Sequence, residues 1–181
     1  MHFPLPVDAR YRYADDFLVA RVGRPYGYNH VLPVRRDGRM QRAHDGVDIR
    51  VPLGTPVLSP FDGTIADPAS RWKPWIRARY GITALVVSEE PTSTGYAALL
   101  AHLSRLDVAV GERVKRGQVL GRTGRTGNAR GTPPHLHFEL RAPFLLPLRR
   151  GSVVRMIDAF DPFPSLVAAD TTTSNGRRTA P

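Results

Sequence analysis

HLHFELR, at residues 135–141, alternates strictly between polar and apolar side chains. Successive side chains of a β-strand point to opposite faces, so this segment is predicted to be a strand with one apolar and one polar face. We expect Leu136, Phe138 and Leu140 to point into the core. His135 and His137 then share the other face, an arrangement typical of a surface or a groove.

The region on the N-terminal side of this strand, from about residue 46, consists of short apolar runs separated by glycine and proline. Short strands with turn signals at regular spacing are typical of an all-β sandwich or barrel. No stretch shows sustained helical periodicity. The runs that we interpret as further strands are VDIRV, TPVLSP, GTIA, ITALVVSE, AALLAHL and ERVKRGQVLG.

Sequence texture divides the chain into three parts. Residues 1–43 are predicted to be an irregular lead-in packing near the groove, residues 44–164 the β domain, and residues 165–181 a disordered tail or linker. Within the domain, residues 70–81 (SRWKPWIRARYG) interrupt the strands with basic and aromatic side chains. We interpret them as a wall of a substrate groove, with ordinary loop packing as the alternative.

Length and composition limit the classes of protein and of site. The 181 residues suffice for one domain with a proper core. Cysteine is absent, which excludes disulfides and thiolate metal sites and leaves histidine and carboxylate as zinc ligands. No apolar run approaches the length of about 20 residues that a membrane span requires. The N-terminus lacks a signal-peptide pattern, so we expect any export signal to have been removed or never present.

The formal net charge of +10 is almost entirely due to arginine, because Lys73 and Lys115 are the only lysines. Arginine binds carboxylates and phosphates, and a basic surface indicates an anionic partner such as nucleic acid, anionic lipid or an anionic wall polymer. The arginines are scattered along the chain, however, which fits simple solvation equally well.

A second polar pattern lies in RAHDGVDIR, where His44 and Asp48 are four residues apart. Both point to one face if the segment is extended, and Gly46 between them leaves room for a close approach of another chain segment. This pair and the His135–His137 pair are about ninety residues apart in the sequence. A zinc ion would be a reason for the fold to bring them together.

Catalytic zinc commonly has three protein ligands and one position for water, whose pKa falls to about 7. Hydrolysis also needs groups that accept and donate protons. His102 in LLAHLSRL joins the four residues above as a fifth candidate. Three of these five residues would bind zinc, and the other two would accept and donate protons. Taken alone, His102 fits a hydrogen-bonded structural histidine better, and His2 and His30 belong to no pattern.

Together these segments resemble the lysostaphin/LytM-type zinc metalloendopeptidases, a family of peptidoglycan endopeptidases. The similar segments occur in the family's order and with its flanking glycines, and they extend over most of residues 15–166. They are DDFLVAR (15–21), RAHDGVDIRVPLGTPVLSPFDGTI (42–65), LLAHLSRLDVAVGERVKRGQVLGRTGRTGNARGTPPHLHFELR (99–141) and AFDPFPSL (159–166).

The resemblance implies one zinc ion per chain, held by His44, Asp48 and His137. It implies that His102 and His135 are the catalytic histidines, which act as general base or orient the water and the oxyanion. The implied fold is a mainly antiparallel, compact β structure (the duplicated hybrid motif) with an open groove over the metal. The implied partners are the peptide cross-links or cross-bridges of peptidoglycan, which places the protein in the cell envelope or outside the cell.

One departure from the family concerns the oxyanion. Some members have a tyrosine six residues before the first zinc ligand, where this chain has Gly38. Either Tyr26 or Tyr28 from the lead-in replaces it, or zinc and the histidines stabilise the oxyanion alone. The lead-in could also be inhibitory, with Asn29 reaching the metal.

Two other functions compete with an active peptidase. A non-catalytic wall-binding or regulatory module of the same family typically lacks one or more ligands, whereas all five positions are intact here. A basic nucleic-acid-binding β domain, with residues 70–81 as a stacking platform, explains the charge but not the histidines. The glycine-rich segment GRTGRTGNARG (121–131) does not predict a nucleotide site, because no P-loop lysine follows it and no helix is expected there.

Overall fold

The computed structural model describes residues 1–22, 31–32, 41–68, 76–147 and 153–170. Several residues that the sequence singles out lie outside these ranges, and so do the expectations attached to them. They are Tyr26, Tyr28, Asn29, His30, Gly38, Trp72, Lys73 and Trp75.

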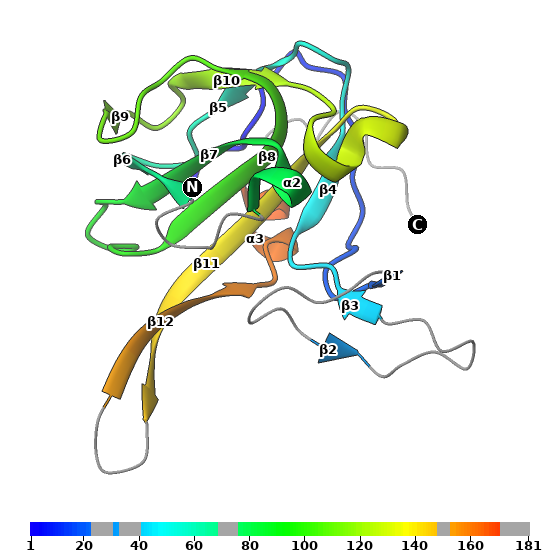
Figure 1. Cartoon of the computed structure of the whole chain (residues 1–181). Helices are drawn as coiled ribbons and strands as arrows, with labels where there is room; N and C mark the ends of the chain where they lie inside the picture. The colour runs from blue at the N-terminus through cyan, green and yellow to red at the C-terminus, as the bar shows by residue number, and fades with distance from the viewer. Residues whose placement is uncertain (23–30, 33–40, 69–75, 148–152, 171–181) are drawn as a thin grey trace.

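The predicted all-β fold is confirmed, because the described residues form one large antiparallel sheet of nine strands (Figure 1). β11 pairs with β4, β8 and β12, and β11 and β12 extend together away from the other strands (Figure 1). The main row of strands is β12 (Val153–Phe160), β11 (His135–Pro147), β8 (Ala97–Leu106), β7 (Ile82–Ser88), β6 (Gly63–Ala66) and β9 (Arg113–Val114). The strands that branch from it are β4 (Val47–Arg50), β5 (Pro56–Leu58) and β10 (Val119–Thr123).

One face of this sheet encloses the main apolar core. As the alternation in HLHFELR predicts, Leu136, Phe138 and Leu140 are buried on that face. β4 follows the same rule, because Val47 and Ile49 are buried in the core while Asp48 between them points to the opposite side. The two strands therefore present their polar residues on one common face, where the candidate site lies.

The lead-in is more ordered than predicted. β1 (Ala20–Val22), β2 (Val31–Leu32) and β3 (Gln41–Ala43) form a separate three-stranded antiparallel sheet. Phe3 and Leu5 are buried in the main core. Strands of two or three residues are too short to give a readable alternation, which explains why the sequence indicates only irregular structure here.

The helices among the described residues are short. They are α2 (Ile76–Tyr80), the 3-10 helix η1 (Gly127–Gly131) and α3 (Phe163–Ala169). No helix among the described residues is long and apolar enough to span a membrane. η1 lies in the glycine-rich segment where we expected no helix, but it is a 3-10 helix of only five residues.

α3 corrects the predicted start of the tail at residue 165. Leu166 of α3 is fully buried in the main core. The Asp170 carboxylate, just after the helix, accepts hydrogen bonds from the Tyr11 and Tyr13 hydroxyls. Residues 165–170 therefore belong to the folded domain and also hold the N-terminal segment, while residues 171–181 lie outside the described residues.

Leu166→Ala is expected to lower the free energy of unfolding by about 2–5 kcal/mol, because it removes a fully buried side chain and leaves a cavity. Urea unfolding followed by circular dichroism measures this change. Ala168→Ser, at an exposed position of the same helix, is the matched control and should change stability by less than about 0.5 kcal/mol. Equal stability of the two variants would show that α3 does not pack as described.

Candidate metal centre

His44 and Asp48 are brought to β11 by a close approach of two backbones. Asp48 lies directly opposite His137 in the antiparallel register of β4 and β11. A Cβ atom on Gly46 would lie 2.3 Å from the Phe138 carbonyl oxygen, so only glycine allows this approach. The room that we expected Gly46 to provide is therefore used to place His44 beside the β11 histidines.

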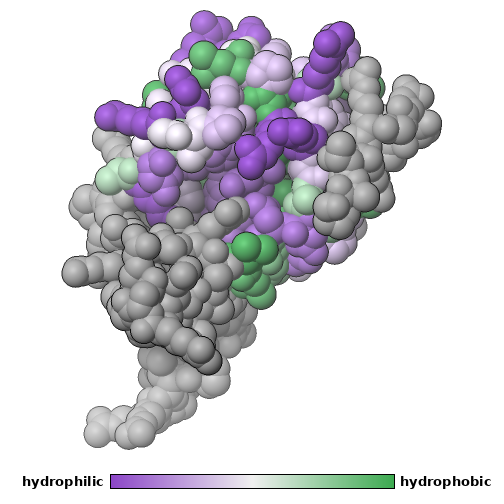
Figure 2. Space-filling view, turned by 90° about the vertical axis from the view of Figure 1, so that its right-hand side faces the viewer, coloured by the Kyte–Doolittle hydropathy of each residue, from purple (hydrophilic) through white to green (hydrophobic). Residues whose placement is uncertain are grey.

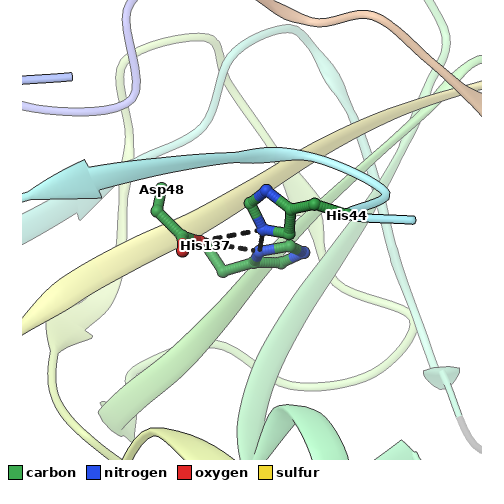
Figure 3. A group of neighbouring side chains, drawn as sticks. All are labelled: His44, Asp48 and His137. Carbon is green, nitrogen blue, oxygen red and sulfur yellow. Dashed lines mark hydrogen bonds and ion pairs between the residues drawn. The ribbon is translucent and has the colours of Figure 1, made fainter. Parts of the chain in front are cut away.

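Three donor atoms of His44, Asp48 and His137 form a small triangle (Figure 3). His44 Nε2 lies 3.0 Å from His137 Nδ1 and 3.2 Å from Asp48 Oδ1. His137 Nδ1 and Asp48 Oδ1 are 3.0 Å apart. In a tetrahedral zinc site with bonds of about 2.0–2.1 Å, neighbouring ligand atoms are about 3.3 Å apart. The three atoms thus match one face of such a tetrahedron, and two imidazoles with one carboxylate are a donor set that suits zinc.

The second nitrogen of each of these imidazoles contacts an oxygen acceptor. His137 Nε2 donates to Glu139 Oε1 at 2.8 Å, and His44 Nδ1 donates to the Asp16 carbonyl oxygen at 3.0 Å. In the neutral ring, each bond leaves the lone pair on the nitrogen that belongs to the triangle. Such outer hydrogen bonds orient metal-binding histidines and raise their basicity.

Glu139, which the sequence alone did not single out, also contacts a candidate metal ligand. Its fully buried carboxylate also accepts a hydrogen bond of 2.6 Å from the Tyr80 hydroxyl and a further one of 2.8 Å from Arg141 Nε. Burial alone would raise the pKa of Glu139, but Arg141, His137 and Tyr80 together hold it well below its usual range. The signal was present in HLHFELR, because alternation places Glu139 on the face of His137.

The histidines of β11 are almost entirely buried and do not lie openly on a surface. His135 is 9% exposed and His137 is 4% exposed. The reason is that Tyr80 of α2, Thr126 before η1 and Asp16 of the lead-in make contacts on this side of the sheet. The Asp48 side chain, 27% exposed, is the most accessible of the three donors.

The electrostatics of the triangle favour a cation. Burial alone would lower the pKa of His44, but hydrogen bonds to Asp16 and Asp48 outweigh it and raise the pKa to about 9. Burial alone would raise the pKa of Asp48, yet His137 and His44 hold it far below its usual range. The Asp48 carboxylate therefore stays charged. A metal ion that binds here would displace the protons held by the imidazoles.

His102 and His135 lie beside the triangle, as predicted. Their rings are 4.9 Å apart between centroids, and His102 is 5.8 Å from the ring of His137. His102 Nδ1 donates to the Thr126 carbonyl oxygen and His135 Nδ1 to the Pro133 carbonyl oxygen, each at 2.9 Å. A carbonyl only accepts hydrogen bonds, so Nε2 of each neutral ring is left unprotonated.

A bulge in β8 places His102 at this position. Three steps along β8, from Leu100 to Leu103, lie opposite two steps along β7, from Ile82 to Ala84, and His102 has a φ of +64°. A non-glycine residue at positive φ is uncommon and marks backbone strain, which often occurs at functional sites. The strained bulge turns the His102 side chain toward the other histidines instead of continuing the alternation of the strand.

Glu139→Gln is expected to weaken metal binding by about 10- to 100-fold, because a neutral amide orients His137 less firmly and lowers its basicity. It also leaves Arg141 buried without its carboxylate partner, so the free energy of unfolding should fall. Zinc affinity is measured by competition with a chromophoric chelator. Glu89→Gln, the same change at an exposed carboxylate, is the control, and wild-type affinity in both variants would contradict the role of Glu139.

The sequence of this chain is similar to those of known peptidases. The profile described as Peptidase family M23 matches residues 42–152. The peptidoglycan DD-endopeptidase ShyA of Vibrio cholerae is 32% identical over 162 residues, 90% of this chain and 30% of ShyA. The DD-carboxypeptidase/endopeptidase Mpg of Neisseria meningitidis serogroup B is 31% identical over 156 residues, 86% of this chain and 31% of Mpg. The chain thus spans less than a third of the length of these relatives.

The fold has solved counterparts as well. The catalytic domain of the antimicrobial peptidase lysostaphin from Staphylococcus simulans superimposes with a TM-score of 0.50 and 29% sequence identity. The superposition covers 81% of this chain and 92% of that domain. The whole of lysostaphin from the same organism gives a TM-score of 0.51 with 28% identity, over 83% of this chain and 52% of lysostaphin.

Proposed function

The chain belongs to peptidase family M23, as its resemblance to the lysostaphin/LytM-type endopeptidases predicted, and on this premise we propose that it is a zinc-dependent endopeptidase. Its substrates are the peptide cross-links or cross-bridges of bacterial peptidoglycan, and its place of action is the cell envelope or the outside of the cell. The observation that carries the proposal is the three-donor face of His44, Asp48 and His137 beside two further histidines, each of which donates from Nδ1 to a backbone carbonyl oxygen.

Each residue of the site has a defined part in this mechanism. Zinc held by His44, Asp48 and His137 would polarise the scissile carbonyl and lower the pKa of a water molecule. His135 Nε2 lies 3.9 Å from Asp48 Oδ1 and therefore borders the triangle. In this proposal His135 accepts a proton from a water molecule and returns it to the leaving amine, while His102 orients that water.

His102 is suited to orienting rather than storing a proton. Burial, together with the nearby His137 and His135, lowers the pKa of His102 to about 3. The ring is therefore neutral at the pH of a living cell, and its Nε2 is available as a hydrogen-bond acceptor. The Gly38 position lies outside the described residues. In this proposal a bound zinc would supply the stabilisation of the oxyanion, and a histidine would add to it only after taking up a proton at Nε2.

The rim of the site supports an anionic substrate. Arg50 lies directly opposite His135 in the β4–β11 register and is exposed, as are Arg125 and Arg130 around η1. Figure 2 shows the side of the molecule on which β4 and η1 lie in Figure 1, and the described residues there are mainly hydrophilic. Carboxylates of peptidoglycan stem peptides, or of anionic wall polymers, suit such a basic rim.

Digestion of purified peptidoglycan tests the proposal. The protein, loaded with one equivalent of zinc, is incubated with peptidoglycan that has direct stem cross-links and with peptidoglycan that has glycine cross-bridges. Mass analysis should show newly released peptide ends from at least one wall type, and excess chelator should abolish them. Zinc binding without any cleavage would reject the endopeptidase and favour the non-catalytic wall-binding module.

A further inference from the structure

Asp16, in the lead-in, contacts two of the three candidate metal ligands. Its carbonyl oxygen accepts the Nδ1 proton of His44 at 3.0 Å, and its Oδ2 lies 3.3 Å from the same nitrogen. Its Oδ1 accepts a hydrogen bond of 3.1 Å from the backbone N–H of Asp48. One residue from outside the family-matched region, residues 42–152, therefore touches both His44 and Asp48.

The backbone on the C-terminal side of Asp16 is held against His44. Leu18 N–H donates to the His44 carbonyl oxygen at 2.8 Å, and His44 N–H donates to the Val19 carbonyl oxygen at 3.1 Å. Leu18 adopts a φ of +59°, a conformation that a non-glycine residue keeps only when its surroundings enforce it. The segment 16–19 is thus fixed against His44, which gives the Asp16 carboxylate a defined position.

We propose that Asp16 is a positioning residue of the metal centre, which makes the lead-in a working part of the site. Its carbonyl and Oδ2 hold the Nδ1 proton of His44, so that the lone pair of Nε2 points into the triangle. Its Oδ1 fixes the start of β4 and with it the Asp48 side chain. Its negative charge beside the imidazole raises the basicity of His44 toward a cation.

This inference rests on the proposed function only for the identity of the metal. Asp16 does not touch the three-donor face itself, so it acts through His44 and Asp48 rather than on the substrate. Asp16→Asn keeps the size of the side chain and the carbonyl contact but removes the charge. The variant also presents an amide where the His44 Nδ1 proton needs an acceptor.

The test is metal binding by the full chain, without any substrate. Zinc and Co²⁺ affinities of the wild type and of Asp16→Asn are measured by competition with a chromophoric chelator. We expect Asp16→Asn to bind each metal about 10- to 100-fold more weakly. The matched control is Asp15→Asn, because Asp15 is the exposed neighbour whose carboxylate accepts only from the Phe17 N–H in the described contacts. Its metal affinity should stay within about twofold of the wild type.

Two further readouts separate positioning from general folding. At saturating Co²⁺, the visible absorption bands of Asp16→Asn should differ from those of the wild type, because the His44 ligand is oriented differently, while Asp15→Asn should match the wild type. In the unmodified protein, the Asp48 amide should exchange slowly with deuterium, since Asp16 Oδ1 accepts its hydrogen bond. The exchange measurement needs no variant, so it remains decisive if Asp16→Asn folds poorly.

The outcomes keep the two proposals apart. Wild-type affinity and spectrum in Asp16→Asn, equal weakening in Asp15→Asn, or a fast-exchanging Asp48 amide would each overturn the role of Asp16. None of these results depends on peptidoglycan cleavage. Conversely, weak metal binding by Asp16→Asn in a protein that cleaves no peptidoglycan would support the positioning role and reject the endopeptidase.

Discussion

Asp48→Asn is expected to remove the bound metal and to lower the rate of peptide hydrolysis by on the order of a thousandfold or more. Asp48 supplies the only anionic donor of the triangle, at 3.0 Å from His137 Nδ1 and 3.2 Å from His44 Nε2. An amide of the same size is neutral and is not among the usual zinc ligands. Without the metal, no group in the described site can activate water comparably.

The measurement pairs metal content with activity. Zinc per chain is determined by elemental analysis after gel filtration, and hydrolysis is followed on purified peptidoglycan fragments. Asp107→Asn makes the same chemical change at a partly exposed carboxylate that pairs with Arg105, and it should retain one zinc per chain and full activity. Full zinc content in Asp48→Asn would refute the assignment of Asp48 as a ligand.

The polar side of the site was readable from the sequence to the extent that it follows strand alternation. HLHFELR predicts which residues of β11 face the core, and His44, Gly46 and Asp48 show the same local logic around β4. The pairing of these segments is a tertiary contact across about ninety residues, so periodicity alone could not supply it. It was the family resemblance that predicted a shared site for the two segments.

The residues that surround the site were not readable in the same way. Asp16 and Tyr80 reach it from segments with no regular pattern, and their hydrogen bonds to His44 and Glu139 exist only after folding. α3 was missed because its seven residues are too few for a helical period to stand out, although Leu166 anchors it in the core. The predicted tail was therefore too long.

His102 shows most clearly what strand alternation cannot predict. Its place in an apolar strand sequence fits a structural histidine, whereas the β8 bulge and the positive φ turn it toward the other histidines. Strand alternation cannot predict a bulge, because one inserted residue reverses the side to which the following residues point. A strained backbone at a buried histidine is instead what a functional constraint produces.

His102→Asn is expected to lower the turnover number by about 100-fold or more while leaving zinc affinity within about twofold of the wild type. Asparagine tolerates a positive φ, and its amide can still donate to the Thr126 carbonyl oxygen, so the bulge should survive. What the variant lacks is the Nε2 acceptor that orients the water. His135→Asn, on the regular strand β11, tests the partner histidine in the same way.

The pH dependence of the loss distinguishes orientation from proton storage. Because the pKa of His102 is lowered to about 3, the ring gains a proton only in strong acid and stays neutral as the pH rises. The ratio of wild-type to His102→Asn turnover should therefore be constant between about pH 5 and pH 8. A ratio that changes tenfold per pH unit in this range would mean that His102 titrates during the reaction, and its role would then be that of a general base with an ordinary pKa.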